Sequence, residues 1–185
     1  PAYNEEITIR ESIAAFHEAL PEAEIIVVDN CSTDGTKEIA QSTLRDLNVP
    51  GRVLSERRKG KGNAVRRAFR EIDADVYLLV DADLTYPPDQ ANELIQPILD
   101  NEADMVVGDR LNAGHYFREN KRPFHDWGNR LVRNLVNSLF RAKLADIMSG
   151  YRAFSRTFVK TYPILVEGFE LETDMTLHAL DKRFR

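Results

Sequence analysis

The sequence predicts an α/β domain with a mostly parallel sheet. Short apolar runs rich in β-branched residues recur without alternation, which is typical of strands covered on both faces. Helical patterns of about 10 to 15 residues separate these runs, as in βαβ units. The chain has 185 residues, enough for one domain that buries roughly 70% of the surface its unfolded form exposes. In such sheets ligands bind at the carboxyl ends of the strands, so we look there for function.

The first half of the chain supplies most of the predicted elements. Apolar residues at positions 9, 13, 16 and 20 predict a helix over residues 5–20, which Pro21 ends. The elements predicted after it are a buried strand at 24–29, a turn at 30–35, a helix to residue 47, a strand at 52–55, a helix at 63–72, a strand at 76–80, a helix at 87–99 and a strand at 104–108.

Beyond residue 108 the pattern is less regular. We expect an irregular polar loop at 109–125, a helix at about 126–141, a short helix after the segment 149–154 and a helical pattern that closes on Arg185. At the other end, residues 1–6 are typical of a loop that leaves a strand. We expect that strand, and any membrane anchor, to lie outside the sequence.

Composition excludes some classes of function. The formal net charge is −5, which argues against nucleic acid as a partner, because domains that bind it usually carry a basic excess. The single cysteine, Cys31, forms no internal disulfide, so a reducing compartment is expected. No run approaches the ~18 apolar residues of a membrane-spanning helix. We therefore expect a cytoplasmic domain.

Two aspartates follow the predicted strand at 76–80 directly. In an extended segment, residues two apart point the same way, so Asp81 and Asp83 can face one point. Mg²⁺ and Mn²⁺ prefer oxygen ligands and commonly take one or two carboxylates together with substrate phosphates. The pair predicts a divalent metal site. Solvated turn residues are the alternative interpretation.

The same segment also fits another pattern. Residues 81–85 match the DxDx[TV] pattern of haloacid-dehalogenase-type phosphatases, in which the first aspartate is a nucleophile and the second a general acid/base. That pattern expects the motif after the first core strand and a lysine after it. Here at least two predicted strands come first, and Lys59 and Lys61 precede the motif. A phosphatase is therefore the less favoured alternative.

Other strand ends and loops carry candidate ligands for a nucleotide. Asp29 ends a buried strand, where its carboxylate can accept hydrogen bonds from a nucleobase or from a turn. Lys61 lies between Gly60 and Gly62 before a helix, an arrangement that favours anions and lets the backbone approach a diphosphate. A solvated basic loop is the alternative.

Arginines and acids in the second half are candidates for the acceptor side. Arg110 and Arg152 suit bidentate contact with phosphate, although surface arginines are common. Acidic side chains crowd a predicted helix start, where they stabilise the helix dipole. One of them, Glu172 or Asp174, is instead a candidate general base for a hydroxyl acceptor.

Taken together, the sequence resembles the family-2 inverting glycosyltransferases of the GT-A fold, and most closely the branch of dolichyl-phosphate mannose synthase and the polyprenyl-phosphate sugar transferases. The resembling segments are Pro1-Ala2-Tyr3-Asn4-Glu5-Glu6, Val27-Val28-Asp29 with Ser32-Thr33-Asp34-Gly35-Thr36, Gly60-Lys61-Gly62-Asn63-Ala64, Asp81-Ala82-Asp83 and Ser149-Gly150-Tyr151-Arg152. Gly108-Asp109-Arg110 departs from the more usual G-[ST]-R. The resemblance implies a nucleotide-diphospho-sugar transferase fold, with a Rossmann-like sheet and flanking helices.

The resemblance also implies roles. It implies one catalytic domain over 1–185, with a nucleotide-sugar and metal half at 1–108 and an acceptor half at 109–185. The implied nucleotide-sugar ligands are Pro1, Tyr3, Glu5, Asp29, Lys61, Asp81 and Asp83; the implied metal ligands are Asp81 and Asp83; the implied acceptor ligands are Ser149 and Arg152; and the implied catalytic residues are Asp83, Arg110, Glu172 and Asp174.

The expected reaction is the metal-dependent, inverting transfer of a sugar from a UDP- or GDP-sugar to an acceptor. The branch implies a polyprenyl phosphate as acceptor and a place at the cytoplasmic membrane face, with Mg²⁺ or Mn²⁺ as cofactor. A phosphate acceptor is already anionic and needs no base, whereas a hydroxyl would need one. A non-catalytic nucleotide-sugar-binding module is a further alternative.

Overall fold

The computed structural model describes residues 1–108, 147–168 and 170–185. Three sequence predictions lie outside these residues: the loop at 109–125, the helix at 126–141 and the phosphate contact of Arg110.

The first half alternates helices and strands, as predicted. Its elements are α1 (Ile9–Ala19), β1 (Ile25–Asp29), α2 (Thr36–Asp46), β2 (Gly51–Ser55) and α3 (Lys61–Glu71). β1 and β2 pair in parallel. Helix α1 begins at Ile9 instead of residue 5, because the segment before it is a turn: Asn4 has a positive φ of 55°, and the Glu5 N–H donates to Thr36 Oγ1 at 2.7 Å.

The second half contains a strand that the sequence analysis did not predict. Its elements are β3 (Val76–Leu79), the 3₁₀ turn η1 (Pro88–Gln90), α4 (Ala91–Leu99), β4 (Met105–Val107), β5 (Arg152–Ser155), α6 (Arg156–Thr161) and α7 (Leu171–Asp181). The unpredicted strand, β5, lies between β3 and β4 and runs antiparallel to both. The predicted α/β fold with a parallel sheet and flanking helices is confirmed by the parallel pair of β1 and β2, and the antiparallel strand β5 between β3 and β4 is an addition that was not predicted.

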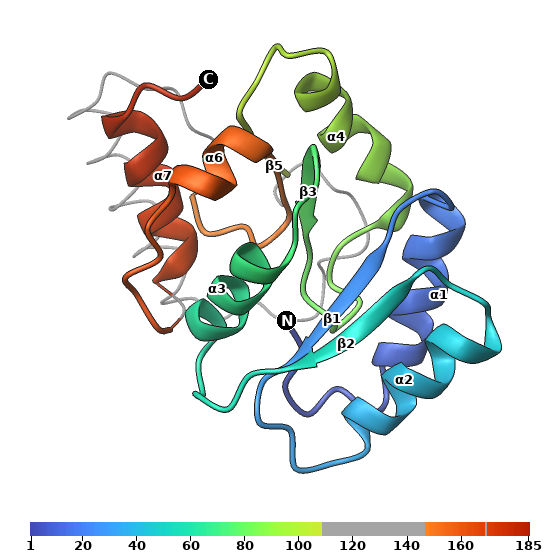
Figure 1. Ribbon diagram of the computed structural model, residues 1–185. Helices are drawn as coiled ribbons and strands as arrows, with labels where there is room; N and C mark the ends of the chain where they lie inside the picture. Colours follow the sequence, from blue (N-terminus) through green and yellow to red (C-terminus); the bar gives the residue numbers. More distant parts are fainter. Residues whose placement is uncertain (109–146, 169) are drawn as a thin grey trace, which may run out of the picture.

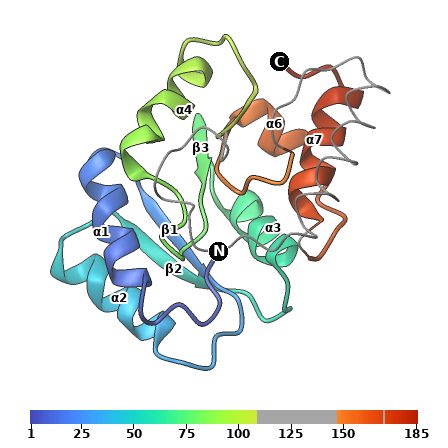
Figure 2. The same ribbon diagram turned by 180° about the vertical axis from the view of Figure 1, so that it is seen from behind.

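Helices cover both sides of the strands, as an α/β fold requires. Figures 1 and 2 show α1 and α2 on one side of the molecule and α6 and α7 on the other, with β1 and β3 side by side between them. One core cluster joins Ile13, Val27 and Leu44, and a second joins Phe154, Phe158 and Met175. In the part of the chain that the structure describes, no helix is both long and apolar enough to cross a bilayer.

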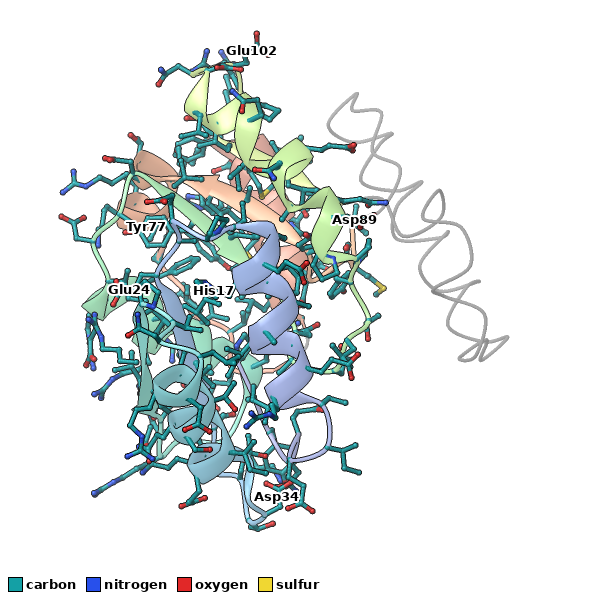
Figure 3. All side chains as sticks on the ribbon, turned by 90° about the vertical axis from the view of Figure 1, so that its right-hand side faces the viewer. His17, Glu24, Asp34, Tyr77, Asp89 and Glu102 are labelled. Atoms are coloured by element: carbon teal, nitrogen blue, oxygen red, sulfur yellow. The ribbon has the colours of Figure 1, made fainter. Side chains whose placement is uncertain are left out.

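The loops that follow the strands gather at one end of the molecule. In Figure 1 the N-terminus lies beside the carboxyl ends of β1 and β3. Figure 3 places Asp34, in the loop after β1, at the end of the molecule opposite Glu102, which follows α4. The residues predicted to carry chemistry come from the end marked by Asp34.

Candidate active site

The two aspartates after β3 differ in what surrounds them. Ala82, between them, is buried in the cluster of Val27 and Ile13, whereas the side chain of Asp81 is 28% exposed. Asp83 is exposed, and among the described residues the hydrogen bond to its carboxylate comes from the N–H of Thr85, at 3.0 Å. Asp83 therefore retains acceptor capacity for a ligand.

Asp81, in contrast, is paired inside the protein. Lys61, at the first position of α3, places Nζ 2.6 Å from Asp81 Oδ1 and 2.5 Å from Glu172 Oε1, at the start of α7. The side chains of Lys61 and Glu172 are only 10% and 6% exposed. One ammonium on α3 thus joins the end of β3 to α7, which lies about a hundred residues further along the chain.

The ammonium stays charged in this setting. Burial by itself lowers the pKa of Lys61, but the charges of Asp81 and Glu172 outweigh it and raise the pKa above its ordinary value. Glu5 lies near the same acidic side chains. Burial raises the pKa of Glu5, a hydrogen bond from Thr8 opposes this, and the nearby charges of Asp83 and Asp81 raise the pKa further.

Gly150 packs against the ion pair of Asp81 and Lys61. Its N–H donates to the Tyr86 hydroxyl at 2.8 Å. A side chain at this position would lie 2.7 Å from Asp81 Oδ2 and 2.9 Å from Lys61 Nζ, so only glycine leaves room for them. The role of Tyr86 could not be predicted from the sequence, because one tyrosine between two motifs carries no pattern. The need for glycine at position 150 depends on side chains that come close only in the fold.

The end of β1 forms the second part of the site. Asp29 is buried and accepts from the N–H of Ser32 at 3.2 Å. Asn30 holds the loop before α3, since its amide donates to Arg58 O and accepts from the Gly60 N–H, both at 2.7 Å. Asn30 had been interpreted only as a turn residue. It fixes the position of the lysine loop relative to Asp29.

The N-terminal residues lie along the same edge. Tyr3 accepts a hydrogen bond from Lys59 Nζ at 2.8 Å, and that ammonium lies 4.3 Å from the centre of the Tyr3 ring. Pro1 is partly buried, and the charge of Asp81 acts on its amino group. Asp29, Tyr3, Glu5 and Pro1 are thus brought to one end of the strands, although their contacts with a nucleotide stay a prediction.

The two glycines of the lysine loop pack against the segment before α7. The Gly62 N–H donates to Glu167 O at 2.9 Å. A Cβ at Gly60 or Gly62 would lie 2.2 Å from Glu167 O or 2.3 Å from Val166 O. These glycines let the segment before α7 approach α3. That they also open the backbone to a diphosphate stays a prediction.

Arg152 and Ser149 are buried in the protein. The Arg152 guanidinium donates to Ser149 O and Ile147 O, each at 2.8 Å, and to Thr176 Oγ1 at 2.9 Å. Both residues are 0% exposed. The predicted contact with an acceptor phosphate stays a prediction, one that this burial does not support. In this structure Arg152 fixes β5 and the Gly150 segment to α7.

Asp174 also has a hydrogen-bond partner within the protein. Its Oδ2 accepts from the Tyr162 hydroxyl at 2.5 Å. Glu172 is held by Lys61. Both candidate general bases therefore have partners within the protein, and their catalytic role stays a prediction.

The site suits a divalent cation that is completed by its substrate. Among the described residues no three His, Cys, Asp or Glu side chains are arranged to hold a metal. Asp83 offers free carboxylate oxygen, and Asp81 is fixed beside it, with Gly150 keeping the space around Asp81 clear. A cation held by one or two carboxylates and by substrate phosphates fits this donor set, which is the usual arrangement for Mg²⁺.

Comparisons with known proteins show the family of this chain. A family model described as "Glycosyl transferase family 2" matches residues 1–162. The protein RfbJ of Shigella flexneri is 44% identical over 114 residues, which are 62% of this chain and 84% of RfbJ. A dolichol-phosphate mannosyltransferase of Pyrococcus furiosus is 31% identical over 180 residues, which are 92% of this chain and 49% of the relative.

A solved structure shows the same fold. Glucosyl-3-phosphoglycerate synthase from Mycobacterium tuberculosis, crystallised with Mn²⁺, uridine diphosphate and phosphoglyceric acid, matches with a TM-score of 0.77 and 25% identity. The match covers 98% of this chain and 62% of that one. The chain thus spans only about half of the mannosyltransferase and less than two thirds of the synthase.

Proposed function

The chain belongs to glycosyl transferase family 2, and from this premise we propose that it transfers a sugar from a nucleoside-diphosphate sugar to a polyprenyl phosphate. The observation that carries the proposal is the difference in surroundings between the two aspartates that follow β3. Asp83 is exposed with free carboxylate oxygen, whereas Asp81 is fixed by Lys61 at 2.6 Å. The phosphatase alternative is contradicted by the family assignment.

The donor would lie across the carboxyl ends of β1 and β3. Asp29 offers a buried carboxylate to a nucleobase, and Tyr3 and Lys59 border the same edge. A Mg²⁺ or Mn²⁺ ion held by Asp83, with Asp81 assisting, would stabilise the charge that develops on the leaving nucleoside diphosphate. UDP and GDP are the nucleotides proposed, and the synthase crystallised with uridine diphosphate and Mn²⁺ supports this class.

We infer the class of acceptor from the partners of the two candidate bases, Glu172 and Asp174. A hydroxyl acceptor needs a base to remove its proton. Of the two acids proposed for that task, Glu172 is in an ion pair with Lys61 and Asp174 is bonded to Tyr162. A phosphate acceptor is already anionic and attacks without one, with inversion at the anomeric carbon. The relative named as a dolichol-phosphate mannosyltransferase supports a lipid phosphate, and with it a place at the cytoplasmic membrane face.

The test compares Asp83→Asn with the unchanged chain. We expect sugar transfer from UDP- or GDP-sugars to polyprenyl phosphate, stimulated by Mn²⁺, and loss of at least about a hundredfold in rate in the variant, equivalent to about 2.7 kcal/mol of barrier. Asp100→Asn, a change of the same chemistry at the exposed end of α4, is the control and should retain full activity. Melting temperatures of all three verify folding.

Three outcomes would contradict the proposal. Unchanged turnover in Asp83→Asn would show that Asp83 holds no metal ion that the transfer needs. Transfer to a hydroxyl acceptor, and not to a lipid phosphate, would contradict the proposed acceptor and would favour Glu172 or Asp174 as the general base. Saturable nucleotide binding without transfer to any acceptor would favour a non-catalytic module.

A further inference from the structure

The turn that carries Asp83 has an unfavourable backbone conformation. Leu84, the next residue, has a positive φ of 60°. A residue with a Cβ rarely adopts this left-handed region, and the conformation persists only where the surrounding structure holds it. Within the turn, the Thr85 N–H donates to Asp83 Oδ1 at 3.0 Å, in a hydrogen bond that is exposed to water. One exposed bond contributes little, so contacts from outside the turn are needed to hold it.

Two stacked tyrosines supply these contacts. Tyr86 directly follows the turn, and Tyr151 directly precedes β5; both are buried. Their ring centroids lie 5.2 Å apart, with an angle of 27° between the ring planes. Each hydroxyl bonds to the backbone of the other segment: the Gly150 N–H donates to the Tyr86 hydroxyl at 2.8 Å, and the Tyr151 hydroxyl donates to Pro87 O at 3.1 Å. We call this reciprocal pair the tyrosine clamp.

The tyrosine clamp is anchored in the core. The Tyr151 ring meets the Phe16 ring edge-on, with centroids 6.1 Å apart, and both tyrosines belong to the apolar cluster of Leu94 and Ile98 on α4. Burial, together with the charge of Asp89, raises the pKa of the Tyr151 hydroxyl above its ordinary value, so the hydroxyl keeps the proton that it donates. The segment after the turn is therefore fixed to α1, α4 and the start of β5.

The tyrosine clamp also lies against the ion pair of the site. The position that a Cβ of Gly150 would take is 2.7 Å from Asp81 Oδ2, 2.9 Å from Lys61 Nζ and 3.1 Å from the Tyr86 hydroxyl. Three polar side chains thus converge on one glycine. Because Tyr86 and Asp83 belong to the same short segment, the position of the tyrosine sets where Asp83 lies relative to Asp81.

We propose that Tyr86 and Tyr151 are positioning residues that hold the Asp83 turn in the conformation that binds a divalent metal ion. This role rests on the proposed function, because Asp83 is the proposed metal ligand. Both rings are buried and both hydroxyls are bonded within the protein, so the two tyrosines act through Asp83. A turn that is already ordered loses less freedom when a ligand binds. The clamp therefore raises the affinity for the ion, and the turnover at saturating metal depends on it little.

Removal of one hydroxyl tests the clamp and keeps its rings. Tyr86→Phe retains the stacked ring and loses the hydrogen bond from the segment before β5. Tyr77→Phe is the matched control: Tyr77 is also buried, and its hydroxyl accepts from the Ala74 N–H and donates to Ile72 O, each at 3.0 Å. Figure 3 shows Tyr77 on the side of the molecule away from Asp89, which follows the clamp. Both variants lose a buried hydroxyl, but only one loses it beside the Asp83 turn.

Two measurements separate positioning from stability. Amide hydrogen exchange at Thr85 reports the turn without any ligand, and it should be about fivefold faster in Tyr86→Phe, the factor that one hydrogen bond typically gives. Electron paramagnetic resonance of free Mn²⁺, titrated with saturating UDP or GDP, should show a Kd raised by about the same factor. Excess Mn²⁺ should then restore turnover. Tyr77→Phe should lower the melting temperature at least as much as Tyr86→Phe and leave exchange at Thr85 and the Mn²⁺ affinity unchanged.

Equal exchange at Thr85 in Tyr86→Phe and the unchanged chain would overturn the proposal, as would equal Mn²⁺ affinities. Matching changes in Tyr77→Phe would also overturn it, because they would assign the effect to stability alone. If the unchanged chain binds no Mn²⁺ with either nucleotide, the proposed function fails, and exchange at Thr85 alone decides whether the tyrosines position the turn. If Tyr86→Phe does not fold, Tyr151→Phe takes its place, since it removes the other hydrogen bond of the clamp.

Discussion

Replacement of Lys61 by methionine tests whether one ammonium holds the site together. Methionine has a similar length but no charge, so Lys61→Met removes the cation between Asp81 and Glu172 and keeps most of the packing. In the protein Nζ lies 2.6 Å and 2.5 Å from the two carboxylates. Without it, two negative charges face each other at a site where Glu172 has almost no access to water.

The expected loss follows from burial. Removal of one partner of a buried ion pair costs about 3–5 kcal/mol. Asp81 is 28% exposed and regains some hydration, so we expect the low end, about 3 kcal/mol. For a domain of this size that lowers the melting temperature by roughly 6–12 °C. The folded pKa of Lys61 lies above the ordinary 10.5, so the contribution is present below pH 10.5 and is lost only as the pH rises through the folded pKa.

Thermal denaturation at pH 7 measures this loss. Lys59→Met is the matched control: the side chain of Lys59 is exposed and its ammonium donates to Tyr3 and lies over the Tyr3 ring, so the change should cost less than about 1 kcal/mol. The double variant Lys61→Met with Glu172→Gln should recover part of the loss, since the amide needs no counter-charge. Equal shifts for the two lysine variants, or no recovery in the double variant, would refute the reasoning.

Two further predictions concern Gly150 and His178. Gly150→Ala places a methyl group against Asp81 Oδ2 and Lys61 Nζ, which must then shift; transfer should fall at least about tenfold, or about 1.4 kcal/mol, and the melting temperature should fall because the ion pair is disturbed, and parallel kinetics and melting curves check this. Burial among Phe158, Tyr162 and Phe184, with Lys182 nearby, lowers the pKa of His178. The unfolded chain then binds the proton more readily, so stability should fall as the pH drops below 6.5. Between pH 7 and pH 5, the melting temperature of His178→Leu should fall less than that of the unchanged chain. Equal falls in the two proteins would contradict this prediction.

Strand ends could be predicted from the sequence because their signal is local. A β-branched run followed by an aspartate identifies Asp29 and Asp81 without any knowledge of the partner strands. The period of two in an extended chain then predicts Asp83 beside Asp81 and Ala82 in the core, and the structure confirms the burial of Ala82. These features depend on a few neighbouring residues only.

Contacts across the fold could not be predicted in this way. Strand β5 was missed because it begins with Arg152, and a charged residue rarely starts a fully buried strand. Its charge is satisfied by Ser149, Ile147 and Thr176, a solution visible only once α7 is in place. The glycines beside Lys61 were assigned to a ligand because the sequence does not reveal the segment at Val166 that packs on them.

The charges around Lys61 connect the two halves of the proposed reaction. Asp81, Asp83 and Glu172 carry three negative charges against the single positive charge of Lys61, so the group has a net charge of minus two. A divalent cation at Asp83 would balance that charge, and like charges so close favour its binding. Glu172 cannot serve as a base without giving up the ammonium that also fixes Asp81. An acceptor that arrives deprotonated avoids this conflict, because the donor site then keeps its geometry while the acceptor attacks.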